Sequence, residues 1–339
     1  MEFLWRSRHF VPRTSFGRPA LLYHTARIQQ LAAEWINIEG IDVIHSHFGW
    51  PEGFGGLLTK AVTGTPVIAT MRGMDVLVER NLGYGLRLSP FYDNALRMLL
   101  RNADRTTHVS DFIRKHAIEL GATTATARTV RKGVDCDHFK PADETETQPD
   151  CPIVLAVGGL VNRKGFDWIL RALSRLVDSH RFAVAIAGDG PERAALEDLC
   201  NQLGLSSRTT FHGDVARHEI QDLFSRCDVF VLGSICEGSG NVLLEALASG
   251  KPVVCTDSGG PSEYVTDGVS GFVVPVADPA AMASRIAQLL DDPPLRRELG
   301  RTGRNHATTR YAYKTMLDEI ISTYRHAIAG QDERTDRTG

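Results

Sequence analysis

The sequence predicts an α/β fold with two doubly wound domains that face a cleft. Three observations favour this class. Short apolar strands alternate with helical segments along most of the 339 residues, a polar, proline-flanked segment at 141–152 divides the chain, and glycine-rich loops follow strands in the second half. Alternation with short connections indicates parallel sheets with right-handed crossovers. Because ligands of such sheets bind beyond the carboxyl ends of the strands, we expect the site in the cleft.

The first domain is expected to span residues 1–140. Its strands are predicted at Ile41–Ile44, Pro66–Thr70, Asp104–Val109 and Ala127–Val130. Its helices are predicted at Leu21–Ile38, Glu52–Val62, Phe91–Arg101 and Asp111–Leu120. Residues 1–20 show scattered arginines and no strand pattern. We therefore expect this domain to be incomplete, and either a truncated gene or a genuinely reduced domain would explain that.

The second domain is expected over residues 153–310, after a linker at 141–152. Its strands are predicted at Ile153–Val157, Phe182–Ala187, Thr209–Phe211, Asp228–Leu232, Pro252–Cys255 and Gly271–Val274, with helices between them. These short apolar runs are typical of strands buried on both faces of a parallel sheet. Residues 311–330 form a closing helix, and we hypothesise that it packs back on the first domain.

Composition describes an ordinary globular protein with an uneven charge. The net charge is −3, yet residues 1–140 carry 18 Lys+Arg and 13 Asp+Glu, or +5, and the remainder carries 20 and 28, or −8. A basic first half suits an anionic acceptor or an anionic membrane surface, and a chance imbalance is the alternative. The six cysteines lack C-x-x-C spacing, and no apolar run approaches ~18 residues. We expect a cytoplasmic protein, with peripheral contact at the inner membrane face left open.

The most informative stretch runs from Ser234 to Glu245. It follows the apolar run Val229–Leu232 and passes through glycines into a helix. A strand, a glycine loop and a helix start in that order make an anion site, because free backbone N–H groups and the helix dipole converge there. Two carboxylates bracket it: Glu237 on the loop, and Glu245 eight residues later. Carboxylates beside a phosphate are useful only where they face another group, and sugar hydroxyls are the natural candidates.

The Glu237–Glu245 spacing resembles the E-x7-E signature of glycosyltransferase family 4. Members of that family are retaining enzymes that use nucleotide sugars and have the GT-B fold of two Rossmann-like domains. A chance pair of glutamates is the alternative for this spacing alone. Further loops at the strand ends match the family in order, so the resemblance covers most of the chain from about residue 41 onward.

The loops of the second domain carry the implied donor site. The segment Val157–Gly165 resembles the family loop G-R-L-x-x-x-K-G, with Lys164 at the phosphate-binding lysine and Gly159 where the family has arginine. Thr256–Glu263 resembles the G-G-x-x-E loop, and an ordinary helix-start carboxylate is the alternative for Glu263. The resemblance implies these donor-binding residues: Gly159, Arg163, Lys164, Gly188, Asp189, Gly213, Gly238, Ser239, Gly240, Asn241, Val242, Glu245 and Glu263.

Two turns of the first domain complete the implied site. Ile44–Gly49 resembles the H-x-H-F turn, which gives His47 a polar role in the cleft, with a satisfied structural histidine as the alternative. Ala69–Asp75 resembles T-x-H-G-x-D, but Arg72 stands where the family has histidine. Arginine cannot relay a proton, although it can hold a leaving phosphate or an anionic acceptor. The resemblance thus gives Glu237, His47 and Arg72 as catalytic residues.

The predicted function is retaining transfer of a sugar from a nucleoside diphosphate sugar to a hydroxyl acceptor, by a hexosyltransferase. The acceptor class, whether glycan, glycolipid or small molecule, stays open. We expect no metal or other cofactor, because a lysine and a helix dipole neutralise the diphosphate, and no nucleic-acid partner. Two alternatives remain: an epimerase of the same architecture, and a non-catalytic nucleotide-sugar binder, which Arg72, Gly159 and the short first domain favour.

Overall fold

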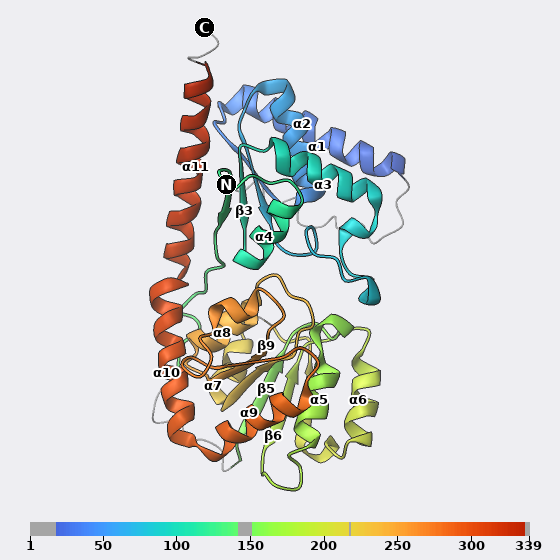
Figure 1. Ribbon diagram of the computed structural model, residues 1–339, viewed down its shortest axis with the longest axis vertical. Coiled ribbons are helices and arrows are strands. Elements are labelled where there is room, and N and C mark those ends of the chain that lie inside the picture. The colour runs from blue at the N-terminus through green and yellow to red at the C-terminus, as the bar shows by residue number, and fades with distance from the viewer. Residues whose placement is uncertain (1–17, 142–150, 217, 336–339) are drawn as a thin grey trace.

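Two parallel sheets organise the chain, one in each half (Figure 1). The computed structural model describes residues 18–141, 151–216 and 218–335, so the predictions for residues 1–17 and for most of the linker lie outside the described residues. We call residues 18–130 the N-terminal lobe and residues 151–310 the C-terminal lobe. The predicted class, two doubly wound α/β units, is confirmed.

The sheet of the N-terminal lobe has the strand order β1-β2-β3-β4, all parallel. The strands are β1 (Ile44–His47), β2 (Val67–Met71), β3 (Arg105–His108) and β4 (Ala127–Thr129). The helical segments are α1 (Arg18–Glu39), η2 (Gly49–Gly53), α2 (Phe54–Thr63), η3 (Arg80–Leu82), η4 (Leu86–Leu88), α3 (Pro90–Asn102) and α4 (Asp111–Glu119). β1 lies three residues later than predicted, because pairing starts only at Ile44, opposite Val67.

The sheet of the C-terminal lobe has the order β10-β9-β8-β5-β6-β7. Its strands are β5 (Ile153–Val157), β6 (Ala183–Ala187), β7 (Thr209–Gly213), β8 (Val229–Leu232), β9 (Val253–Thr256) and β10 (Phe272–Val274). Its helical segments are η5 (Asn162–Lys164), α5 (Phe166–Ser174), α6 (Arg193–Gln202), η6 (Ser206–Arg208), α7 (Ile220–Arg226), α8 (Asn241–Ala248), η7 (Pro261–Tyr264), α9 (Pro279–Asp291) and α10 (Pro293–Arg310). The order reverses between β5 and β8, which is where such sheets bind ligands.

Successive residues of β5 feed two separate apolar cores. Val154 and Ala156 pack into the cluster that contains α5 and α9, whereas Leu155 and Val157 pack into the cluster that contains α7 and α8. Side chains of a strand alternate between faces, so a strand that is apolar throughout needs a helical layer on each side. This packing explains why the apolar runs of the second half were recognisable in the sequence.

The last helix, α11 (Tyr313–Thr335), runs along the N-terminal lobe (Figure 1). The Tyr324 hydroxyl lies 2.8 Å from Nδ1 of His45, and Arg105 donates to the backbone carbonyl of His326 over 3.2 Å. Nε2 of His45 lies 2.7 Å from the Thr70 hydroxyl. Within the described part of the chain, no helix combines the length and apolar content needed to cross a bilayer.

Two histidines of the N-terminal sheet are held neutral. Burial, followed by the charge of His47, lowers the pKa of His45 to about 3. Burial likewise lowers the pKa of His108 to about 4, although one ring nitrogen of His108 lies 3.0 Å from the Arg128 carbonyl. The unfolded chain therefore binds more protons than the native chain from pH 6.5 downward, and acid destabilises the fold through both groups.

We expect the free energy of unfolding to fall between pH 7 and pH 5, by about 2 kcal/mol for each of these histidines. Urea unfolding at the two pH values measures this loss. His108→Gln should show a smaller fall in the free energy of unfolding between pH 7 and pH 5, whatever its effect on stability at pH 7. The exposed His212→Gln is the control and should keep the full loss. Equal acid sensitivity in both variants would refute the assignment.

Candidate active site

The loops that follow β5 and β8 lie directly against each other. Gly165 has φ +62°, and a Cβ there would lie 2.0 Å from the carbonyl oxygen of Gly233. The amide of Ile235 donates to the carbonyl of Arg163 over 2.8 Å. Only a glycine permits this approach, since a side chain would strike the backbone of the neighbouring loop. The contact therefore places the loop after β5, which carries Arg163 and Lys164, against the loop after β8, which carries Glu237.

Two cations and one carboxylate meet at this point. Lys164 and Arg163 both pair with the same oxygen of Glu237, Arg163 over 3.2 Å. From the N-terminal lobe, the ring of Tyr84 lies 4.9 Å from the Arg163 guanidinium carbon, and burial raises the pKa of Tyr84 to about 12. The sequence analysis assigned Arg163, Lys164 and Glu237 to one site, but it did not predict that the two cations pair with the carboxylate.

The start of α8 faces the same loop. Gly240 precedes the helix with φ +76°, and no side chain caps its first amides. Ser239 is buried, and its hydroxyl donates to the Asn241 side chain over 3.4 Å. Val242 lies in the first turn and Glu245 in the second. Backbone N–H groups at such a terminus attract anions, which suits the phosphate role expected here.

The predicted donor residues after β6 and β7 make contacts that order the loops. Gly188 donates its amide to the Gly213 carbonyl over 2.7 Å, and a Cβ on Gly188 would lie 2.0 Å from the Gly158 carbonyl oxygen. The Asp189 carboxylate accepts from the Gly190 amide over 2.7 Å and pairs with Arg193 over 3.1 Å. Their donor contacts stay predictions.

Gly159 differs from these glycines. A Cβ at this position would meet one atom within 4 Å, the Asp189 carbonyl oxygen at 3.9 Å. Packing therefore does not demand a glycine there, and the longer side chain of the family pattern would fit at least at its base. Its role in donor binding also stays a prediction.

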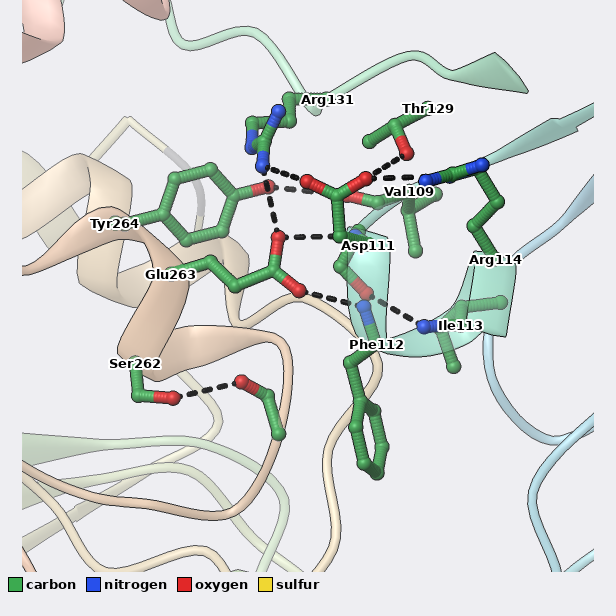
Figure 2. Close-up of polar contacts among 12 residues, drawn as sticks. Val109, Asp111, Phe112, Ile113, Arg114, Thr129, Arg131, Ser262, Glu263 and Tyr264 are labelled. Atoms are coloured by element: carbon green, nitrogen blue, oxygen red, sulfur yellow. Dashed lines mark hydrogen bonds and ion pairs between the residues drawn. The ribbon is translucent and has the colours of Figure 1, made fainter. Parts of the chain in front are cut away.

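Glu263 makes contacts that the sequence did not predict, because its carboxylate crosses to the other lobe (Figure 2). It accepts the first amides of α4, from Asp111 over 2.9 Å and from Phe112 over 2.6 Å, and it pairs with Arg131 over 3.0 Å. The next amide of α4, that of Ile113, donates to the Ser110 hydroxyl over 3.2 Å. Glu263 thus caps a helix that the motif does not include, and its donor role stays a prediction.

Other contacts extend this junction between the lobes. The Ser110 hydroxyl donates to the Gly238 carbonyl over 2.7 Å, and the Tyr264 hydroxyl donates to the Val109 carbonyl over 3.3 Å. The amide of Gly260 donates to the Glu237 carbonyl over 3.1 Å. The loop that carries Glu237 is therefore held from both sides, by the Glu263 segment and by the N-terminal lobe.

His47 ends β1 and Arg72 follows β2, and these two strands are adjacent and parallel in the N-terminal sheet. The buried Asp75 carboxylate accepts the amides of Arg72 over 3.1 Å and Gly73 over 2.9 Å, which fixes the turn after β2. A Cβ on Gly238 would lie 2.4 Å from the Arg72 carbonyl oxygen, so this turn touches the Glu237 loop. Burial, then Arg72, then Lys132 lower the pKa of His47, which favours a neutral imidazole.

Sequence reasoning missed Tyr84 and Lys132 as site residues. Tyr84 lies between two short 3₁₀ turns without a periodic pattern, and Lys132 lies after β4, outside any helix or strand. For Lys132, the two consecutive basic residues Arg131 and Lys132 were the sequence feature that could have indicated a binding site. Among the described residues, no three His, Cys, Asp or Glu side chains gather as metal ligands would, and a metal-free site stays a prediction.

The fold and this site define a two-lobed glycosyltransferase, and comparison with known proteins identifies its family. A model described as Glycosyltransferase Family 4 matches residues 3–138, and one described as Glycosyl transferases group 1 matches residues 140–306. A GDP-mannose-dependent alpha-(1-6)-phosphatidylinositol monomannoside mannosyltransferase from Mycolicibacterium smegmatis is 31% identical over 293 residues, which cover 80% of this chain and 74% of that protein. The chain belongs to glycosyltransferase family 4 and is a nucleotide-sugar-dependent glycosyltransferase.

Solved structures show the same GT-B fold. Sucrose-phosphate synthase from Thermosynechococcus elongatus has a TM-score of 0.81 at 23% identity, covering 94% of this chain and 82% of its own. Anabaena HepE, in complex with UDP and glucose, has a TM-score of 0.76 at 22% identity, covering 91% and 83%.

We expect Glu263→Ala to lower the free energy of unfolding by about 1 kcal/mol, because two amides of α4 lose their cap. Turnover should also fall, because the Glu237 loop loses its support, while nucleoside diphosphate affinity should hold. Asp278→Ala is the matched control: Asp278 caps α9 through the amides of Ala280 and Ala281, within one lobe. It should cost similar stability and spare turnover. A large loss of nucleotide affinity in Glu263→Ala alone would contradict this expectation and support the donor role.

Proposed function

We propose that this protein transfers a hexose, with retention, from a nucleoside diphosphate sugar to a hydroxyl acceptor. The observation that carries the proposal is the pairing of Lys164 and Arg163 with Glu237, on the loop that leads into α8. Two cations and free helix amides suit a diphosphate, whereas a carboxylate beside them suits sugar hydroxyls. Lys164 would exchange Glu237 for the diphosphate when the donor enters.

In the proposed reaction, the bond between the anomeric carbon and the diphosphate oxygen breaks while the acceptor oxygen bonds to that carbon on the same face. The acceptor proton passes to the departing diphosphate. Lys164 and the α8 amides would stabilise the negative charge that develops on the leaving group, and this needs no divalent metal. Glu237 would hold the sugar. Arg72 and the neutral imidazole of His47 would line the side of the site that the N-terminal lobe forms.

For the acceptor we propose a hydroxyl on a glycan or glycolipid. The name of the mycobacterial relative includes GDP-mannose and a phosphatidylinositol monomannoside, which are a guanosine nucleotide sugar and a membrane glycolipid. The +5 charge of residues 1–140, from 18 basic and 13 acidic side chains, supports an anionic acceptor or peripheral contact with an anionic membrane at its cytoplasmic face.

Incubation with GDP-mannose, UDP-glucose and UDP-N-acetylglucosamine, each with a panel of glycan and glycolipid acceptors, tests this function. We expect released nucleoside diphosphate and a product whose anomeric proton coupling matches that of the donor. Activity should persist in EDTA. An inverted product would refute retention, an epimerised nucleotide sugar would indicate an epimerase, and binding without turnover would indicate a non-catalytic binder.

Lys164→Met and Glu237→Gln should distinguish the role of the lysine from the role of the glutamate in the ion pair. Lys164→Met should weaken nucleoside diphosphate binding by roughly 1.5–3 kcal/mol, because a charge-assisted contact is lost. Glu237→Gln should leave that affinity unchanged or tighter, because it frees Lys164, and should reduce transfer. Isothermal titration and turnover measure both. Lys314→Met, on α11 and paired with Asp318, is the control. Equal loss of nucleotide affinity in both variants would contradict these roles.

A further inference from the structure

Two basic side chains near the junction of the lobes lack an acidic partner. Their neighbours are paired: Arg131 with Glu263, and Lys164 with Glu237. Within the described ranges, neither the guanidinium of Arg72 nor the ammonium of Lys132 makes a hydrogen bond or ion pair, and Arg72 instead lies over the Phe48 ring at 5.3 Å. Half-buried cations without partners are costly, so such a pair needs an explanation.

The charge of each of these cations affects the ionisation of His47. Arg72 and Lys132 both act on the imidazole of His47, and Arg72 acts on Lys132. Burial and then Arg72 lower the pKa of Lys132 to about 8. Burial lowers the pKa of Arg72 and the negative charge of Asp75 opposes that shift, but the Asp75 carboxylate already accepts hydrogen bonds from the backbone amides of Arg72 and Gly73.

The backbone places this cluster at the face between the lobes. His47 ends β1 and Arg72 follows β2, so both lie at the carboxyl edge of the N-terminal sheet. The Arg72 backbone touches Gly238, next to Glu237. Lys132 follows β4, and it also lines a cavity of about 340 Å³ together with Arg131, Arg310, Tyr311 and Glu319.

We propose that Arg72, Lys132 and His47 form a binding site for an oxyanion, phosphate or carboxylate, of a ligand held between the lobes. The guanidinium can bind two oxygens of such a group, the ammonium adds a point charge, and neutral His47 can donate one N–H. The oxyanion comes either from the donor diphosphate or from an acidic group on the acceptor. This inference rests on the proposed function for the identity of its ligand.

Calorimetric titration of Arg72→Met and Lys132→Met tests the site, with the exposed Lys115→Met as control. GDP and UDP are titrated alone, and inorganic phosphate is titrated into protein saturated with either. If the diphosphate is the ligand, both variants should bind nucleotide about tenfold or more weakly. If an acidic group of the acceptor is the ligand, both variants should keep their affinity for GDP and UDP and should lose their affinity for inorganic phosphate. Unchanged affinity for both probes in both variants would overturn the proposal.

A second measurement uses the wild-type chain, so it does not depend on how the variants fold. An anion beside Lys132 raises its pKa, so binding of inorganic sulfate should take up a fraction of a proton at pH values across the range in which Lys132 titrates. Heats measured in buffers of different ionisation enthalpy give this number. Lys132→Met should abolish the uptake, which separates Lys132 from its neighbours His47, Arg131, Arg310, Tyr311 and Glu319. No uptake in the wild-type chain would refute the site. A chain that binds anions here and transfers no sugar would refute the transferase proposal alone.

Discussion

The position of the candidate site depends on one carboxylate that crosses between the lobes. Glu263, on η7, accepts the two leading amides of α4, and Ser110 accepts the next. Helix-start amides have no partner within their own helix, so a cap supplied by another lobe joins the two lobes by hydrogen bonds. The same segment binds the Glu237 backbone through Gly260. The segment that joins the two lobes therefore also holds the loop that carries Glu237.

Separation of the lobes would expose a definite set of unpaired groups. The Glu263 carboxylate, two α4 amides and the Ser110 hydroxyl would lose partners, and the Phe112 ring would leave Gly259, where a Cβ would lie 2.5 Å from that ring. Arg131 would keep Asp111, at 2.6 Å, on its own side. Water can satisfy each exposed group at modest cost, so these contacts permit opening while favouring one closed geometry.

The sequence predicted what parallel-strand packing dictates and missed what crosses between lobes. Buried strands such as Val229–Leu232 are apolar because both faces are covered, and the loops that follow them must meet at one edge, which placed Lys164 near Glu237. Pairing, not hydropathy, sets where β1 begins, so Ile41–Ile44 was placed three residues early. The partners of Glu263 and the contact of Tyr84 with Arg163 join segments far apart in sequence, and no local periodicity encodes them.

The two basic clusters differ in how their charge is balanced, and this difference bears on the order of events. In the C-terminal lobe, Glu237 pairs with both Lys164 and Arg163 and offsets one of their two charges, so under the proposed function an entering diphosphate would exchange one anionic partner for another. Arg72 and Lys132 have no such partner among the described residues, so an anion there relieves like-charge repulsion directly. A donor that releases Glu237 from Lys164 would leave that carboxylate free for sugar hydroxyls only after the phosphate is seated. Under the proposed function, the ion pair would thus link donor binding to the release of Glu237, and the unbalanced cations of the N-terminal side would favour a ligand that carries negative charge.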